Sequence, residues 1–282
     1  MKTRVGAAVL IGLGLLVVAV ILMGIVRQRK AHDQVSCLNN FRELGQFAAL
    51  YEKNARDPQE SAKPEIRNLA VPAGTIVNPA LPVESRLSWT ADSLQSLSQK
   101  RQPTAALAGR LERTAAWDSD RNRELSQTPL VLFQCPGAAP EHRIGEPALT
   151  QYVGLAGIGP DGATLGLGPP VPNRAGCFRY DEPTPYLTIR NGDGLASTLL
   201  FAETRRDLGP WIRGGTSTVR MLDVSEGAPP YVGGQFGGNY AGIAGFGLAD
   251  GGARFFTEHQ HPNVIRSMMT IDGTGEDPLI GE

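Results

Sequence analysis

The hydrophobic pattern divides the chain sharply near its start. Residues 5–26 form an unbroken uncharged and almost wholly apolar run. As a helix this run is about 33 Å long, enough for a bilayer hydrocarbon core of roughly 30 Å. It ends in the polar sequence 27–30 with no small-x-small cleavage motif beyond, so we predict a retained transmembrane segment rather than a cleaved signal. Basic residues on its two sides nearly balance, and charge alone leaves the orientation open.

The apolar pattern then changes to one face of an amphipathic helix. Apolar residues recur in steps of three and four at Leu38, Phe41, Leu44, Phe47, Ala48 and Tyr51. No Gly-Pro punctuation separates this stretch from the apolar run, and Gly45 is the one weak point. The sequence therefore predicts one long helix, with transmembrane segment 5–26 and amphipathic continuation 27–56, whose second half packs on a globular domain.

Residues 57–270 are predicted to form a β-rich domain, followed by a flexible Gly- and acid-rich tail at 271–282. The Pro-rich stretch 58–82 is expected to be a surface connection, and 87–113 two short helices interrupted near Pro103. Short apolar runs bounded by turn residues predict strands at 130–134, 152–157, 186–189, 197–202 and 210–213.

The strongest local signal is a hairpin over residues 246–256. Apolar side chains flank Asp250-Gly251 on both arms. Asp-Gly suits the two positive-φ positions of a type I′ turn, which we expect here.

Composition favours short strands and many turns over a helical bundle, which together with the long helix predicts an α+β fold. The chain has 34 Gly and 21 Pro among 282 residues and a formal net charge of −1. Neither a basic patch nor a strong charge imbalance suggests nucleic acid as a partner.

The three cysteines could hold one disulfide in an exported domain. Cys37 with Cys135 would tie the long helix to the sheet; two buried apolar thiols, or Cys177 paired with Cys135, are the alternatives.

Other chemistry is sparse, and we expect neither a cofactor nor catalysis. His259 and His261 form a His-x-His without an evident third ligand, which favours a solvated loop. Calcium is a weaker alternative, with Asp250, Asp272 and Asn239 as candidate oxygen donors. A hydrolase would need a nucleophile and base, and no Gly-x-Ser-x-Gly elbow occurs.

Several motifs in order resemble the prepilin-like family catalogued as domain of unknown function 1559, common in planctomycete bacteria. The matching segments are Ser36-Cys37-Leu38-Asn39-Asn40 with Leu44-Gly45, Ala116-Trp117-Asp118-Ser119 with Asn122, Phe133-Gln134-Cys135-Pro136, Thr150 to Gly154, and Ile189 to Glu203. The resemblance implies a pilin-like fold: a long N-terminal helix packed on an antiparallel β-rich domain.

Two departures from the family pattern bear on function. The family signature is a histidine, nine residues, then Asp-Gly; here Tyr240 stands at the histidine position before Asp250-Gly251. A role that needs an imidazole is therefore not expected. Second, Ile11 stands where a pilin helix carries a glutamate five residues after its processing-site glycine, here Gly6. A buried carboxylate can pair with a neighbouring subunit, and its absence removes that register device.

The resemblance favours a single-pass membrane protein with a cytoplasmic N-terminus and a periplasmic or extracellular domain. We expect a pilin- or pseudopilin-like structural or interaction protein, similar to type II secretion components, with like subunits or secretion components as partners. The alternative is an envelope binding module that recognises a glycan, peptide or metal through Gly-rich loops.

Overall fold

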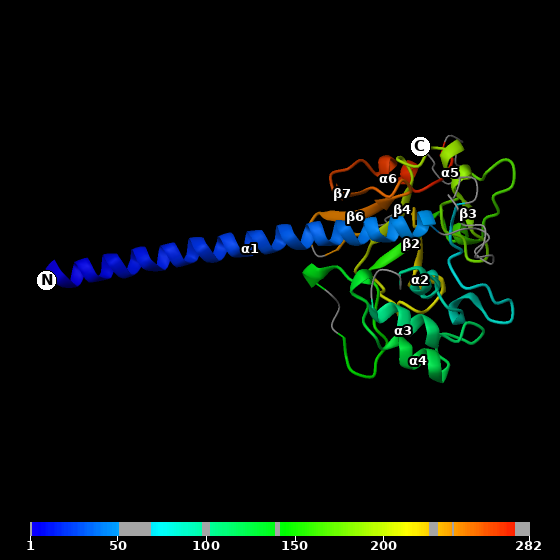
Figure 1. Cartoon of the computed structure of the whole chain (residues 1–282). Coiled ribbons are helices and arrows are strands. Elements are labelled where there is room, and N and C mark those ends of the chain that lie inside the picture. Colours follow the sequence, from blue (N-terminus) through cyan, green and yellow to red (C-terminus); the bar gives the residue numbers. More distant parts are fainter. Residues whose placement is uncertain are drawn as a thin grey trace.

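A long helix with a domain at one end dominates the molecule. The computed structural model describes residues 2–50, 69–97, 102–138, 142–225, 231–238 and 240–273. Helix α1 runs without interruption from Lys2 to Leu50, and its N-terminal half projects free of the domain (Figure 1). The single long helix predicted from the apolar pattern is therefore present, and residues 51–56 of its expected end lie outside the described residues.

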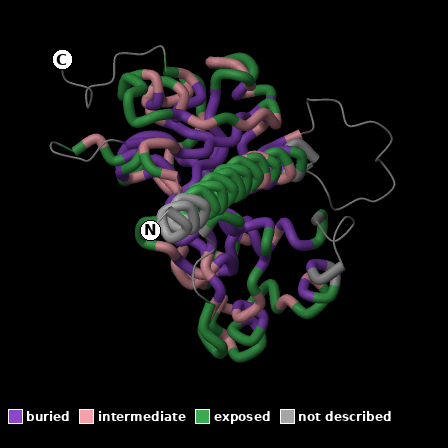
Figure 2. Tube along the Cα trace, turned by 90° about the vertical axis from the view of Figure 1, so that its left-hand side faces the viewer, coloured by how far each residue is buried: buried purple, intermediate pink, exposed green. Residues whose placement is uncertain are grey.

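Helix α1 has two distinct environments along its length. In its projecting part the apolar side chains of residues 12–26 are exposed, with Leu15 at 66% and Leu22 at 56% (Figure 2). In its second part Cys37, Phe41 and Leu44 are fully buried against the domain. The segment Gly12–Gln46 is long and apolar enough to cross a membrane. Exposed apolar surface of this extent is typical of a helix whose solvent is lipid.

The domain is built on a five-stranded sheet in the order β5-β2-β4-β6-β7. The strands are β2 (Tyr152–Ile158), β4 (Leu199–Glu203), β5 (Val219–Leu222), β6 (Ile243–Leu248) and β7 (Ala253–Thr257). Neighbours are antiparallel except β2 and β5, which are parallel. The expected antiparallel sheet is therefore a mixed one.

Glycines on β6 create the seat for α1. A Cβ at Gly245 would lie 2.7 Å from the ring of Phe41, and one at Gly247 would lie 3.2 Å from it. Because neither residue carries a side chain, the ring lies directly on the strand, edge-on to Tyr152 with centroids 4.7 Å apart. Small residues on β6 thus decide where the helix packs.

The main core is aromatic, and the buried residues Phe41 and Leu44 of α1 belong to it. Trp89 packs against Phe133, Phe178 and Phe201, with ring centroids 5.2–6.0 Å apart. Its indole N–H donates to the carbonyl of Thr218 over 2.8 Å, so the polar edge of this buried ring is paired. Around this core lie α2 (Trp89–Leu97), α3 (Gln102–Arg110), α4 (Asp120–Ser126) and α5 (Tyr186–Asn191). Ile265 of α6 (Pro262–Met268) packs in a second core cluster with Phe246 of β6.

Two of the predicted helices and two of the predicted strands are in place. Helices α2 and α3 are the pair expected over 87–113, and Pro103 lies in the first turn of α3, where its missing N–H costs nothing. Strands β2 and β4 occupy the runs expected at 152–157 and 197–202.

Three strand predictions were wrong. Residues 186–189 belong to helix α5, which buries Tyr186 and Ile189 three positions apart on one face. Residues 130–134 contain the 3-10 turn η2 (Val131–Phe133), and 210–213 makes isolated bridges only. Short apolar runs fit a strand or one helical turn equally well, and the neighbouring Pro185 set the helical start.

The expected hairpin is present, but its turn type was wrong. Gly251 has φ +84°, whereas Asp250 has no positive φ. The N–H of Gly251 donates to Leu248, and the N–H of Leu248 donates to Gly252. This is a three-residue loop ending in a left-handed glycine, and the carboxylate of Asp250 accepts from the N–H of Gly252 over 2.7 Å.

Two expected surface segments are partly buried. Ala70 and Val71 form β1 (Ala70–Val71), which pairs with β3 (Thr184–Pro185) inside the domain; residues 58–68 of the expected connection lie outside the described residues. Ile271, assigned to the flexible tail, is fully buried and its N–H donates to Ala175. Residues 274–282 lie outside the described part of the chain.

Candidate functional site: the helix seat and its glycine-rich pocket

The disulfide expected between Cys37 and Cys135 is the one that the structure contains. It joins α1 to the segment before η3 (Pro136–Ala138), with Cα atoms 5.2 Å apart and a sequence separation of 98. Cys177 is buried and outside any disulfide, which excludes the alternative pairing in this structure. Burial raises the pKa of the Cys177 thiol well above its ordinary range. The cross-link therefore fixes the helix to the domain covalently.

Of the two motif asparagines, only Asn40 hydrogen-bonds from α1 to the domain. Its buried amide donates to the carbonyl of Gln134 over 3.0 Å and more weakly to that of Val131 over 3.4 Å. Asn39 is exposed, and its side-chain oxygen accepts from Arg42 on the same helix. A buried amide that satisfies carbonyls of a 3-10 turn explains why this position suits Asn and not an apolar residue.

Tyr240, at the histidine position of the resembled signature, lies where the helix meets η3. A Cβ at Gly137 would lie 2.6 Å from the Tyr240 hydroxyl and 3.4 Å from the Cβ of Asp33 on α1. Burial, with the negative charges of Asp33 and Glu203, raises the pKa of Tyr240 to about 12. Its ring also packs edge-on to Phe255. Pro136 begins η3 and is exposed.

A buried glutamate that no sequence motif marked lies beneath the seam, the contact of α1 with β6 and η3. Glu203 ends β4 and is fully buried, with one carboxylate oxygen within 4.8 Å of the sulfurs of Cys37 and Cys135. Burial and the charge of Glu203 raise the pKa of Tyr152 far above its ordinary value. No sequence pattern distinguishes Glu203, because a single polar residue at the end of an apolar strand is ordinary.

These three side chains are the only His, Cys, Asp or Glu group of metal-ligand size among the described residues. A disulfide sulfur is a poor ligand compared with a thiolate, so the oxidised group does not fit a metal. The calcium candidates are not brought into such a group: Asp250 caps its own turn, Asp272 lies beside Asp193, and Asn239 lies outside the described residues.

The predicted His-x-His is divided between two roles. The Nδ1 atom of His261 accepts from the N–H of Asn263 over 3.2 Å and caps α6, while His259 is exposed. The histidines border a small cavity of about 250 Å³ with Glu258. His259 therefore lies in a solvated loop, as the sequence predicted, whereas the helix cap made by His261 was not predicted.

A second cavity, of about 290 Å³, opens beside Tyr240 and is bordered mainly by glycines and two arginines. We call it the glycine-rich pocket; its lining is Arg205, Arg206, Gly233, Gly234, Gly237, Gly238, Tyr240, Ala241, Gly242 and Ile243. A Cβ at Gly238 would lie 1.9 Å from a carboxylate oxygen of Glu203, so the glycine backbone separates that buried carboxylate from the pocket. Such a wall exposes main chain to a ligand.

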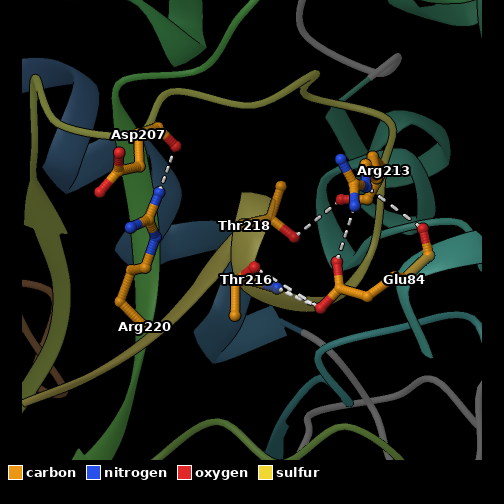
Figure 3. Close-up of polar contacts among 6 residues, drawn as sticks. All are labelled: Glu84, Asp207, Arg213, Thr216, Thr218 and Arg220. Atoms are coloured by element: carbon orange, nitrogen blue, oxygen red, sulfur yellow. Dashed lines mark hydrogen bonds and ion pairs between the residues drawn. The ribbon is translucent and has the colours of Figure 1, made fainter.

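A polar cluster on η1 (Val83–Ser85) and η5 (Gly215–Ser217) is a structural joint instead. The carboxylate of Glu84 accepts from Arg213 over 3.2 Å and from the N–H of Thr216 over 3.1 Å (Figure 3). Arg220 donates to the carbonyl of Asp207 over 2.5 Å, and burial lowers the pKa of this arginine. The Glu84 carboxylate binds the loop that contains Arg213 and Thr216, and we therefore assign it a structural role.

Comparisons with known proteins identify no relative of this chain. No family model matches the chain, and no curated protein or solved structure gives a significant match.

Proposed function

We propose that this protein is a membrane-anchored, pilin-like structural or interaction protein of the cell envelope, with no catalytic reaction. Its N-terminus lies in the cytoplasm and its domain in the periplasm or outside the cell. The observation that carries this proposal is the division of α1: one continuous helix is apolar and exposed over residues 12–26, then has one face buried against the domain and is cross-linked at Cys37.

The design of α1 supports a role in which the domain stands at a fixed distance and angle from the membrane. A helix without a hinge transmits orientation, and the Cys37–Cys135 bond prevents the domain from sliding along it. Ile11 offers no carboxylate for a neighbouring subunit's amine. We therefore propose an anchor that stays in the bilayer and contacts like subunits or secretion components, rather than a subunit that leaves the bilayer to build a fibre.

Mass spectrometry of the N-terminus of the full-length protein tests the retained anchor. An intact start, or one that lacks only Met1, is the expected result. A mature chain that begins with methylated Ala7 would overturn the retained-anchor proposal and favour pilin-type maturation. Flotation of cell membranes through a density gradient provides a second readout, in which the uncleaved protein should rise with the bilayer after a salt wash.

Photo-crosslinking in intact cells tests the partner class. A photoreactive residue at Asn39, exposed on the docked part of α1, should give bands with like subunits or secretion components. The same probe at Arg121, exposed on α4, is the matched control. Equal band patterns at the two positions would contradict a partner contact that follows the helix.

A second candidate is an envelope binding module, and the glycine-rich pocket is the observation that favours it. The pocket combines exposed arginine side chains with glycine backbone in a cavity of about 290 Å³. A cavity of this size suits one small polar group rather than a drug-sized apolar ligand. The two candidates are compatible, because a protein held at the membrane can also bind a ligand there.

A further inference from the structure

The position of the glycine-rich pocket along α1 places it close to the membrane. Tyr240 borders the pocket and reaches Gly137, which itself meets Asp33 of α1. Asp33 follows the last residue of the apolar run, Val26, by a stretch of helix about 10 Å long. The polar headgroup layer extends roughly 5–7 Å beyond the hydrocarbon on each side. The Tyr240 side of the pocket therefore lies within a few ångströms, measured along the helix axis, of the level of the lipid phosphates.

The direction of β4 leads to the same location. Leu199 pairs with Leu248 near the hairpin turn, whose Gly251 meets Gly45, the end of the seat farther from the membrane. Glu203, at the other end of β4, lies beside Cys37. The chain thus runs toward the membrane as it leaves the strand, and Arg205 and Arg206 follow immediately.

The charges around the pocket suit an anion on its open side. Arg205 and Arg206 are both exposed, and in the described part of the chain neither makes an ion pair. Of the nearby acidic groups, Glu203 is buried behind Gly238, whereas Glu258 is exposed, with its carboxylate 3.1 Å from a Cβ position at Gly242. Exposed Arg27, Arg29 and Lys30 on α1 add positive charge at the same level of the membrane.

We propose that the glycine-rich pocket binds the phosphate of an anionic phospholipid in the leaflet beside the domain. The guanidinium groups of Arg205 and Arg206 donate to the phosphate oxygens, and the glycine wall lets the headgroup approach the main chain. Each basic residue near an anionic surface also gains electrostatic attraction. This contact gives the domain a second attachment to the bilayer, besides α1, and holds one face of the domain toward the lipid. It rests on the membrane anchoring proposed above.

Native mass spectrometry of the full-length protein, released from lipid nanodiscs, tests the site. The discs contain phosphatidylcholine with a minority of phosphatidylglycerol, and the readout is the number and identity of retained lipids. Wild-type protein should retain phosphatidylglycerol selectively, and Arg205→Gln/Arg206→Gln should lower that retention about tenfold. The matched control is Arg121→Gln/Arg123→Gln, which removes the same charge from exposed positions on α4, away from α1 in Figure 1. It should leave retention unchanged.

Three outcomes would overturn the lipid site. The first is equal retention by wild type and the pocket variant, and the second is an equal fall in the α4 control. The third is loss of phosphatidylglycerol when inorganic phosphate is added at millimolar concentration, because a free anion would then be the better ligand. Failure of the anchoring proposal is seen separately, since a protein without a retained span would not enter the discs at all.

Discussion

Removal of the Cys37–Cys135 bond should destabilise the domain more than any comparable change in the core. The perturbation is Cys37→Ala/Cys135→Ala in the full-length protein. The bond closes a loop with a sequence separation of 98. In the chain-entropy model, a loop of this size contributes about 4–5 kcal/mol to the free energy of unfolding. Two buried sulfur atoms are also lost, at roughly 1 kcal/mol each by analogy with a buried methyl group.

Cys177→Ala is the matched control, because Cys177 is equally buried and has no cross-link. It should cost only the truncation, about 1 kcal/mol. Thermal unfolding in detergent micelles, followed by the fluorescence of buried Trp89 and Trp211, measures both. We expect the double variant to lose about 10–20 °C of Tm and the control about 2–4 °C.

The two single variants sharpen this test. Either Cys37→Ala or Cys135→Ala alone breaks the bond, so each should lose nearly as much as the double variant. A double variant that loses no more than twice the control would refute the reasoning, since the bond would then contribute nothing beyond the buried atoms.

Three further predictions follow from the seam. Although alanine favours a helix, Gly45→Ala should lower the free energy of unfolding by about 1–2 kcal/mol in denaturant titrations, because its Cβ would lie 2.9 Å from the Cα of Gly251. The control Gly109→Ala, on α3 with open space around it, should instead raise stability by up to about 1 kcal/mol. A change of the same sign in both variants would contradict this reasoning. Asn40→Ala should cost about 1–3 kcal/mol, because it leaves a buried carbonyl without its donor, and a neutral result would show that water replaces the amide. The pKa of Tyr240 is raised to about 12, so the folded state keeps the phenol proton at a pH where the unfolded chain loses it, near pH 10. The contribution of Tyr240 to stability should therefore be full below pH 10 and fall between pH 10 and 12. Tyr240→Phe should make this fall less steep, and an unchanged alkaline slope would contradict the raised pKa.

Much of the long-range organisation could be predicted from local patterns. The apolar run and the helical spacing of Phe41 and Leu44 predicted one continuous helix, and its two halves differ in burial as expected. The flanks of Asp250-Gly251 predicted the hairpin, since alternation and turn residues act over a few positions only. A long helix and a hairpin each close within themselves, so sequence patterns suffice for them.

Features that depend on contacts between distant segments were not predictable in this way. Tyr186 to Ile189 is compatible with a strand or a helix, and burial of both ends on one face selected the helix α5. The turn type at Asp250 depended on the hydrogen bonds of Leu248, which donates to Gly252 and accepts from Gly251, and not on the Asp-Gly pair alone.

The sequence by itself determined that the protein has an apolar span, an amphipathic continuation and a turn-rich β domain, because hydrophobic periodicity reports which faces must leave water. Only the tertiary structure decided what meets at the seam. From the sequence, Gly45 is only a weak helix position, and the structure shows that it contacts Gly251. Likewise, Glu203 is only a polar residue at the end of a strand in the sequence, and the structure places it beside Cys37 and Cys135. The glycine-rich pocket likewise exists only once Arg205 and Tyr240 are brought together. Close approach of backbones and charges depends on packing between segments far apart in the chain, and local patterns carry no record of it.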